Sequence, residues 1–495
     1  MVNLKNIGTG SVPLKLAAEI TKLVNQKWKN GEFLEKISPI TQDLLKFWFS
    51  ESNCIVRNIN FHEGQKQAIL NTIYLHEVLK NVSVKDNYLN ICPEILSEID
   101  ITDLEQKKYL HPKYCLKLAT GTGKTWILHA LIIWQYLNAR YEQKDEIEKT
   151  NRFSQNFLLV APGLIVYERL LDAFVGKENK DGQRDFLTSD FKQYEELFIP
   201  PQYKNELFTF IQSSILKKDD IAKRKSSNGM IAITNWHLLA GISEEEIEEI
   251  NPIENPSVAI LKLRPIAPGT SGGNSLDTLD RKYQYGNELE YLKNLPNLVV
   301  FNDEAHHIHE FKKAGETLEV EWQKSLNEIS ENKENNFIQI DFSATPYNVT
   351  GSGQNRTKQY FAHIIANFDL NIAISKGLVK LISIDKRKEI ATAPLDFKAE
   401  RENNLVVALS EGQKVMLRAG YTRLKQLEVE FEKLNQKKYP KMLIITEDTK
   451  VSPLVSKFFI DEGFEKDDVM QIDSNKKNEI SLVSSVIINI FGYFF

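Results

Sequence analysis

The sequence ATGTGKT occupies residues 119–125 and separates two different patterns of apolar residues. Residues 114–118, just before it, form a short apolar run of strand length, and residues 124–140 repeat apolar side chains at helical spacing. Glycine at Gly121 and Gly123 lets backbone N–H groups turn inward, where they can surround phosphate oxygens. The stretch therefore predicts a phosphate-binding loop between a strand and a helix. A glycine-rich turn that binds nothing is the alternative.

The last two residues of this stretch supply a charge and a hydroxyl that suit a nucleotide. Lys124 carries a mobile cation for the β- and γ-phosphates of a nucleoside triphosphate, and the Thr125 hydroxyl is a ligand for Mg²⁺. The general pattern has a further glycine five positions before Gly123, where this chain has Leu118, so it departs from the strict form and keeps GxGKT. The predicted nucleotide-binding residues of the loop are Thr120, Gly121, Thr122, Gly123, Lys124 and Thr125.

Short apolar runs of strand length alternate with helical patterns beyond this loop. Besides 114–118, the expected strands are 157–160, 231–234, 298–301 and 338–342. Apolar residues at helical spacing predict a helix over 65–80, and residues 14–49 predict a helical lead-in. Continuous apolar strands that alternate with helices are typical of a doubly wound α/β fold with a buried parallel sheet.

An acidic pair follows the predicted strand 298–301. The chain reads DEAH at 303–306, so two carboxylates arrive at the carboxyl end of a buried strand, where ligands bind in open α/β sheets. Asp303 is suited to hold Mg²⁺ through its water shell, and Glu304 to orient or deprotonate an attacking water. An acidic pair alone is weak evidence. Downstream of GxGKT, this pair predicts a catalytic site made of Lys124, Asp303 and Glu304.

Histidines gather directly after these carboxylates, at His306, His307 and His309, with Glu310 beside them. A zinc site is one interpretation of such a cluster. The metalloprotease pattern H-E-x-x-H is absent, however, and the carboxylates precede the histidines. We therefore expect His306 to belong to the nucleotide site and the other two histidines to make local hydrogen bonds.

Two hydroxyl residues follow the predicted strand 338–342, in the sequence Ser343-Ala344-Thr345-Pro346. Hydroxyls at a strand end can bond the acidic pair and sense the γ-phosphate of a nucleotide. This triplet is common by chance, but its position after a strand and downstream of Glu304 gives it weight. We expect Ser343 and Thr345, together with His306, to couple nucleotide hydrolysis to movement.

The phosphate loop, the DEAH sequence and the SAT sequence, in this order, resemble the motor of superfamily-two helicases and translocases. The resemblance implies a RecA-like P-loop NTPase domain, with Gln65 in the upstream segment 61–69 reading the adenine edge. Segments 160–170 and 233–239 resemble the strand-end motifs that contact the nucleic-acid backbone; an ordinary sheet edge is the alternative. The residues that these motifs imply as nucleic-acid contacts are Pro162, Gly163, Arg169, Thr234 and Asn235.

The amino-acid sequences of the motifs indicate a narrower family. ATGTGKT, APGLIVYERL, the long interval before DEAH, and SATP resemble the restriction (Res) subunit of type III restriction–modification enzymes, over about 61–474. The resemblance implies a two-lobed motor that clamps duplex DNA and hydrolyses ATP with Mg²⁺ between its lobes. It also implies a partner, the modification methyltransferase subunit, because contacts to the DNA backbone carry no sequence information.

The resemblance leads us to divide the chain into five parts. These are a helical lead-in over 1–60, a first RecA-like domain over 61–355 with a flexible insertion at about 241–295, a connecting segment over 356–440, the start of an incomplete second RecA-like lobe over 441–480, and an apolar tail over 481–495. Within the insertion, residues 243–249 predict a capped, exposed acidic helix start and residues 268–275 a flexible loop.

The end of the chain departs from the family pattern. The motifs that carry the arginine finger, and the nuclease domain that should follow, have no counterpart before Phe495. Residues 481–495 contain no charged residue, which leads us to expect a truncated chain whose reading frame changes near residue 480. A genuine terminal helix or strand is the alternative.

Composition limits the remaining classes of protein. The net charge of −5 excludes a uniformly basic nucleic-acid coat but permits a local basic groove. Cys54, Cys92 and Cys115 are too few and too far apart for a disulfide framework or a thiolate zinc site. No apolar signal core or run of about 18 apolar residues is found, so we expect a cytoplasmic protein without a membrane span.

Three functions remain open at this stage. The first is the motor of a type III-like restriction subunit without its nuclease. The second is a stand-alone DNA or RNA helicase, and a methyltransferase reading frame beside the gene would favour the first over it. The third is a product that binds nucleotide or DNA without turnover.

Overall fold

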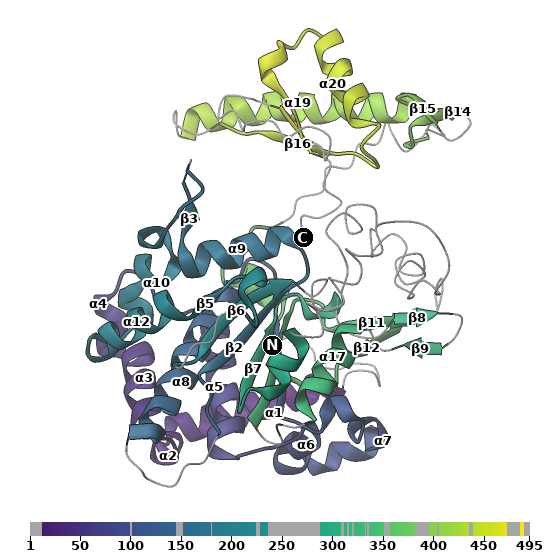
Figure 1. Ribbon diagram of the computed structural model, residues 1–495. Helices are drawn as coiled ribbons and strands as arrows, with labels where there is room; N and C mark the ends of the chain where they lie inside the picture. The colour runs from purple at the N-terminus through teal and green to yellow at the C-terminus, as the bar shows by residue number, and fades with distance from the viewer. Residues whose placement is uncertain are drawn as a thin grey trace. The chain divides into compact units, whose positions relative to one another are not determined.

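The computed structural model describes residues 12–99, 101–144, 152–179, 181–223, 228–235, 288–307, 311–313, 316–318, 321–331, 333, 336–350, 357–381, 396–402, 405–434, 439–472 and 486–489. The chain divides into two compact units, Met1–Leu381 and Ile382–Phe495, which are described separately (Figure 1). The acidic segment 243–249 and the loop 268–275 of the predicted insertion lie outside the described residues.

The first unit is built around a seven-stranded sheet whose neighbouring strands are all parallel. Its strand order is β13-β1-β10-β7-β2-β6-β5. The strands are β1 (Lys113–Leu118), β2 (Asn156–Ala161), β5 (Ile215–Leu216), β6 (Met230–Asn235), β7 (Leu298–Asn302), β10 (Phe337–Ser343) and β13 (Ile364–Phe368). The five strands expected from the sequence are all present, and the α/β fold with a parallel sheet is confirmed.

Both faces of this sheet are buried, which explains why its strands are mostly apolar. Along β2, Phe157 and Leu159 join the large hydrophobic cluster on one face, while Leu158 and Val160 join a second cluster on the other. Alternate residues of a strand point to opposite faces, so a sheet that is covered on both faces favours apolar side chains along most of each strand.

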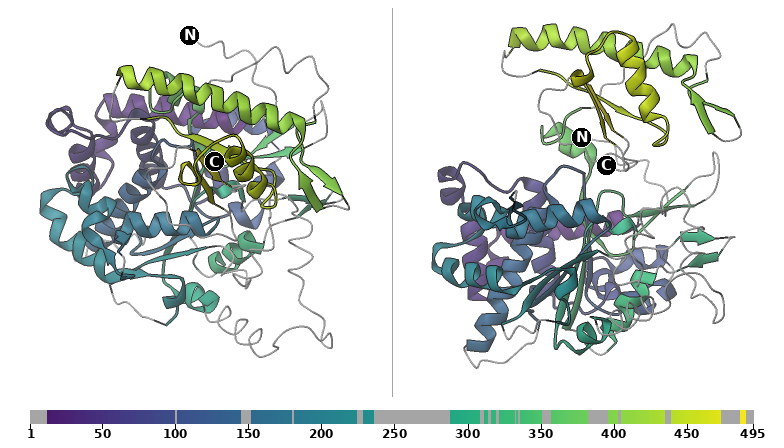
Figure 2. Two further views of the ribbon diagram at one scale, coloured as in Figure 1. Left: turned by 90° about the horizontal axis from the view of Figure 1, so that it is seen from above. Right: turned by 45° about the horizontal axis from the view of Figure 1, so that its top comes forward.

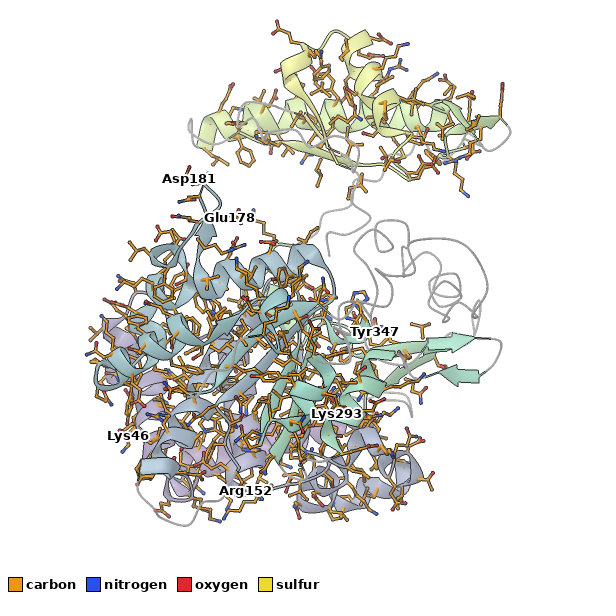
Figure 3. The ribbon with its side chains drawn as sticks, viewed as in Figure 1. Lys46, Arg152, Glu178, Asp181, Lys293 and Tyr347 are labelled. Carbon is orange, nitrogen blue, oxygen red and sulfur yellow. The ribbon has the colours of Figure 1, made fainter. Side chains whose placement is uncertain are left out.

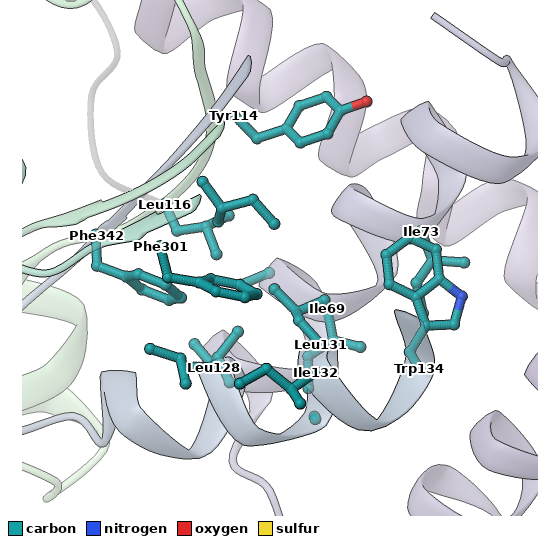
Figure 4. Packing of buried hydrophobic residues seen from close by; sticks show 14 of the residues in the cluster. Ile69, Ile73, Tyr114, Leu116, Leu128, Leu131, Ile132, Trp134, Phe301 and Phe342 are labelled. Carbon is teal, nitrogen blue, oxygen red and sulfur yellow. The ribbon is translucent and has the colours of Figure 1, made fainter. Parts of the chain in front are cut away.

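The helices over the first face come from the N-terminal part of the chain and from the strand connections. Side chains of α5 and α8 meet strand residues such as Phe301 and Phe342 there (Figure 4). The longer helices of this unit outside the second face are α1 (Val12–Lys29), α3 (Pro39–Phe49), α5 (Glu63–Ile73), α6 (Val84–Ile91), α8 (Lys124–Lys144), α9 (Leu164–Val175) and α12 (Lys204–Ser214). The helix expected over 65–80 is α5 followed by a π-helical turn, η3 (Tyr74–Val78).

The N-terminal helices belong to the same hydrophobic core as the sheet. Trp48 of α3 is fully buried, and its indole Nε1 donates to the carbonyl of Phe198 at 3.0 Å. Among the described residues, shorter α-helices of this unit are α2 (Glu32–Glu35), α4 (Glu51–Val56), α7 (Ile101–Leu104), α10 (Asp190–Gln193), α11 (Glu195–Phe198) and α18 (Leu370–Ser375). The segment predicted as a lead-in over 1–60 therefore packs as part of the first unit wherever it is described.

The second face is covered by α17 (Glu321–Ser330) and a helix over 288–294. Trp322 of α17 is fully buried against this face. Lys293, labelled in Figure 3, pairs with Glu328 at 3.0 Å and so ties the two helices together. The cover over this face is thus apolar beneath and charged at the surface.

Short antiparallel hairpins project from the first unit (Figures 1 and 2). They are β3 (Lys177–Glu178) with β4 (Arg184–Asp185), β8 (Phe311–Lys313) with β9 (Glu316–Leu318), and β11 (Tyr347–Thr350) with β12 (Thr357–Tyr360). After the third hairpin the chain returns as β13 beside β1. The compact unit consequently extends to Leu381, beyond the boundary that we expected at residue 355.

The second unit contains a three-stranded parallel sheet in the order β16-β18-β17. Its elements are β14 (Glu400–Glu402), β15 (Leu405–Ala408), α19 (Glu411–Leu434), β16 (Met442–Ile445), α20 (Ser452–Asp461), β17 (Val469–Ile472) and β18 (Val486–Asn489). The central strand, β18, lies within the segment 481–495 that was predicted as an apolar tail.

Across the described residues, the helices are too short or too polar to cross a membrane.

Candidate nucleotide-binding site

The glycine-rich loop between β1 and α8 has the backbone that its sequence predicts. Gly121 and Gly123 have φ angles of 82° and 71°, in the left-handed region that favours glycine. Thr122 lies between them, and its hydroxyl donates to the carbonyl of Ala119 at 2.6 Å. Leu118, which replaces the usual first glycine, is the fully buried last residue of β1.

A histidine and a glutamine from the start of α5 hold the carbonyls of this loop. Gln65 donates from Nε2 to the carbonyls of Gly123 at 3.0 Å and Thr122 at 3.3 Å, and its Oε1 accepts from the N–H of His62. Nε2 of His62 lies 2.8 Å from the carbonyl oxygen of Thr122. Nδ1 of His62 accepts from the N–H groups of Gly64 and Gln65, so Nε2 must carry the proton. Gln65, predicted to read adenine, therefore contacts the loop backbone here.

The charged residues of the loop and of the acidic pair meet at the carboxyl edge of the sheet. Nζ of Lys124 bonds to Oε1 of Glu304 and lies 3.9 Å from Oδ1 of Asp303. The three side chains are only 11%, 18% and 19% exposed in the order Lys124, Glu304, Asp303. Residues far apart in the sequence are thus brought together with opposite charges in a poorly solvated position.

The backbone around the acidic pair is strained and closely held. Glu304 has a φ of 48°, an unfavourable value for a residue with a side chain, and its N–H donates to Oδ1 of Asp303 at 3.0 Å. The N–H of Asp303 donates to the carbonyl of Val160 in β2. Burial raises the pKa of the Asp303 carboxyl above its ordinary value, and the positive charge of Lys124 opposes this shift.

The SAT sequence contacts the end of DEAH. Nδ1 of His306 lies 3.0 Å from the hydroxyl of Ser343, which also accepts from the N–H of Thr345 at 3.1 Å. Nδ1 of His306 is 3.6 Å from Oε2 of Glu304. A continuous set of contacts therefore runs from the catalytic carboxylate candidate to the residues expected to couple hydrolysis to movement.

The other histidines of the cluster bear on the zinc alternative. The ring of His307 packs 4.1 Å from that of His306, and burial lowers the pKa of His307. Among the described residues, no group of three or more His, Cys, Asp or Glu side chains is arranged to hold a metal. His309 and Glu310 lie outside the described residues.

The residues expected to contact nucleic acid lie at or beyond the ends of β2 and β6. Pro162 and Gly163 are half-buried, and Arg169 is exposed on α9, where its charge opposes, with that of Lys124, the rise that burial causes in the pKa of Asp303. Thr234 and Asn235, at the end of β6, are buried instead, with 0% and 2% of their surfaces exposed. The sequence thus located the sheet edge, while the side chains of β6 do not face solvent there.

Several residues of this site carried no prediction. Phe368, the last residue of β13, accepts from the N–H of Ala119 at 2.9 Å, and its ring fills the space beside Gly64. Asp341 of β10 accepts from the Nδ2 of Asn302 at 2.7 Å directly beneath the acidic pair. His62 also carried no prediction, although it stands three residues before Gln65, which is the spacing of a helix-capping box.

These residues fit ATP and Mg²⁺. The loop between β1 and α8 ends at the start of a helix, whose free N–H groups suit phosphate oxygens, and positive φ angles at Gly121 and Gly123 shape its backbone. Thr125 and Asp303 supply a hydroxyl and a carboxylate, the oxygen ligands that Mg²⁺ takes in small number when phosphates and waters complete its shell.

Comparison with known proteins agrees with this geometry. The family model described as "Type III restriction enzyme, res subunit" matches residues 58–348, which is more than half of the chain and includes the loop, DEAH and SAT. No curated protein matches the chain significantly. The seven-stranded parallel sheet with a glycine-rich loop after β1 is that of a P-loop, RecA-like domain. This chain therefore belongs to the family of type III restriction enzyme Res subunits and carries its helicase-like domain.

Proposed function

We propose that the chain is the ATP-hydrolysing, DNA-translocating motor of a type III-like restriction endonuclease subunit. The observation that carries the proposal is the convergence of three separate sequence motifs on one point. Lys124 of the loop contacts the acidic pair, and His306 of the same box contacts Ser343. If the loop were only a glycine-rich turn that binds nothing, we would not expect these charged and hydroxyl side chains to meet at the carboxyl edge of one sheet, where ligands bind in open α/β folds.

Lys124 is proposed to change partners when nucleotide binds. Its ammonium pairs with Glu304 in this structure. The β- and γ-phosphates of ATP carry more negative charge than one carboxylate, and they would draw the ammonium toward the loop. Glu304 is then released to accept a hydrogen bond from the attacking water. The exchange makes the water-orienting carboxylate available when nucleotide phosphates occupy the loop.

Thr125 and Asp303 are the residues that would hold Mg²⁺. When bound, this ion neutralises charge that develops on the phosphate oxygens during transfer. Asp303 must be ionised to serve as a ligand. Because its burial favours the protonated form, the nearby positive charges of Lys124 and Arg169 assist ionisation.

The contacts among His306, Ser343 and Thr345 support a role in coupling. Ser343 accepts from the backbone of Thr345 and also contacts His306, which neighbours Glu304. A shift of Glu304 on nucleotide binding would therefore move the start of the hairpin that follows β10. Such a link converts the state of the nucleotide into a displacement at the sheet edge.

Duplex DNA is the proposed track and a modification methyltransferase the proposed partner. Pro162 and Gly163, with the exposed Arg169, stand at the same edge of the sheet and suit contact with the DNA backbone. Thr234 and Asn235 would contribute by shaping this edge from beneath, since they are buried. Backbone contact gives no sequence readout, so recognition falls to the partner.

The first test is steady-state ATP hydrolysis by the purified chain with Mg²⁺, with and without duplex DNA. Duplex DNA should stimulate turnover, and single-stranded DNA and RNA of equal length should stimulate it less. Lys124→Ala should abolish both nucleotide binding and turnover. Glu304→Gln should abolish turnover and retain binding, because the amide keeps the shape but loses the charge that orients water.

The outcomes separate the alternatives. Stimulation by RNA in preference to DNA would point to a stand-alone RNA helicase. ATP binding without turnover under every condition would identify a nucleotide-binding product that lacks motor activity. Unchanged ATP binding in Lys124→Ala would refute the proposed site itself.

A further inference from the structure

A fully buried polar cluster lies directly beneath the acidic pair and connects β7, β10 and the segment before β13. Its centre is the carboxylate of Asp341. Oδ1 accepts from Nδ2 of Asn302 at 2.7 Å and from Nε2 of Gln339 at 3.0 Å, while Oδ2 lies 2.8 Å from Nε2 of His363. These four side chains have no exposed surface. Removing a buried carboxylate that has several hydrogen-bond partners is costly, because the buried donors are left without an acceptor.

The cluster and the SAT contact hold the acidic pair from both sides. Asp341 of β10 lies opposite Asn302 of β7 in the parallel pairing of these two strands, and Asn302 is the residue just before Asp303. Beyond the pair, His306 contacts Ser343 of the same strand, β10. The loop that contains Asp303 and Glu304 is therefore attached to β10 at its start and at its end.

The attachment coincides with the strained backbone of Glu304. A non-glycine residue at φ 48° persists only where its surroundings over-determine the conformation. Asn302 is fixed on two sides, because its Nδ2 donates to Asp341 and its Oδ1 accepts from the indole Nε1 of Trp322 in α17 at 3.2 Å. Because the side chain of Asn302 is held on two sides, these contacts oppose a shift of the end of β7 that would relax the next two residues.

We infer that Asp341 is a positioning residue that, through Asn302, keeps Glu304 in its strained conformation and thereby aims its carboxylate. This role rests on the proposed function only in its consequence for hydrolysis. The geometric part concerns the backbone of Glu304 and can be tested without any turnover. Gln339 and His363 fix the carboxylate of Asp341 in turn.

The first experiment measures strain by a double-mutant cycle in urea denaturation of the full chain. Glu304→Gly and Glu304→Ala both remove the carboxylate, but only glycine accepts a positive φ without strain. The glycine variant should therefore have the higher denaturation midpoint in the wild-type background. In an Asp341→Ala background, where the loop can relax, this difference should disappear or reverse, because glycine also loses more conformational entropy on folding.

Controls exclude a general loss of stability. Asn87→Ala removes another fully buried polar side chain, on α6, and should leave the Gly/Ala difference intact. Asn302→Ala breaks the same contact from the other strand and should abolish the difference, which keeps the test decisive if Asp341→Ala fails to fold. Asp341→Asn retains an oxygen that can accept from Asn302, so the difference in midpoint between Glu304→Gly and Glu304→Ala should persist in this background. An equal Gly/Ala difference in the Asp341→Ala and wild-type backgrounds would overturn the inference.

The second experiment divides binding from chemistry. Asp341→Ala should lower kcat for ATP hydrolysis by about tenfold or more, because small displacements of an orienting group have large effects on rate. The Kd for ATP should stay within about twofold, since the loop and Lys124 are untouched. A parallel loss of both would indicate a merely structural residue and contradict the inference. If the wild-type chain has no turnover, the proposed function fails while the strain cycle still decides the role of Asp341.

Discussion

Gly121 and Gly123 have similar, positive φ angles but different neighbours. Both have positive φ angles, so any side chain is strained at either position. A Cβ at Gly121 would meet only the side chain of Val379, at 4.0 Å, whereas one at Gly123 would meet Nε2 of Gln65 at 2.6 Å. The two positions therefore separate backbone strain from loss of the contact between the loop and α5.

We predict that Gly121→Ala costs about 1 kcal/mol of unfolding free energy, from strain alone. Gly123→Ala should cost about 2–4 kcal/mol, because displacing the amide of Gln65 also breaks its hydrogen bonds to the carbonyls of Thr122 and Gly123, which costs about 1–3 kcal/mol. Urea denaturation measures both free energies of unfolding, and titration with ATP measures how the loss of the contact with Gln65 in Gly123→Ala changes nucleotide binding. Only Gly123→Ala should release the carbonyls of Thr122 and Gly123 from Gln65. Equal costs for the two variants would contradict a supporting role for Gln65.

At the scale of elements, α5 and β13 jointly position the phosphate loop. Gly64 is in the first turn of α5, and a Cβ there would overlap the ring of Phe368 at 2.5 Å. The carbonyl of Phe368 in turn accepts from Ala119 at the start of the loop. The loop is thus held by the helix before it in the sequence and by a strand that arrives more than two hundred residues later.

We predict that Gly64→Ala destabilises the first unit by about 1–3 kcal/mol and weakens ATP binding, because the ring of Phe368 must move. Gly420→Ala is the matched control, since Gly420 also lies within a helix, α19, and its closest neighbour is the flexible side chain of Met442 at 3.1 Å. Alanine is the better helix former by about 1 kcal/mol, so Gly420→Ala should be neutral or stabilising. Denaturation curves of both variants test the comparison, and a stabilised Gly64→Ala would refute it.

At the scale of the whole molecule, buried histidines make stability depend on pH. Burial lowers the pKa of several histidines, to about 4 for His76 and to about 3 for His111. The unfolded chain binds protons on these residues below pH 6.5, while the folded chain does not. Stability is therefore fully present above about pH 6.5 and is lost as the pH falls.

We predict a decrease in unfolding free energy between pH 6.5 and pH 5, above the range in which ordinary carboxylates titrate. Each such histidine contributes up to about 1.4 kcal/mol per pH unit in this window. His111→Gln removes one titrating group and can still donate to Oε1 of Gln339, which lies 3.3 Å from Nε2 of His111. In this variant the unfolding free energy should depend less steeply on pH, by an amount that corresponds to at most one proton taken up on unfolding. Stability that is constant or rises as the pH drops through this window would disprove the assignment.

The local pattern determined much of the fold and the type of site. The five expected strands of the first sheet were predictable from their apolar runs, because a parallel sheet buried on both faces favours apolar side chains along most of each strand. The loop, DEAH and SAT were predictable as functional segments because each follows such a strand. The roles assigned to their individual residues remain predictions, which the variants above test.

Tertiary structure alone decided how these segments meet. The order β13-β1-β10-β7 places Asp341 beside Asn302 and Phe368 beside the phosphate loop, although no local pattern specifies which strands are neighbours. The burial of Thr234 depended in the same way on its packing within the sheet rather than on its place in a motif. The sequence by itself therefore determined which residues reach the carboxyl edge of the sheet. Only the fold decided which of them touch, because contacts across strands depend on strand order and register, and these are set by packing over the whole domain.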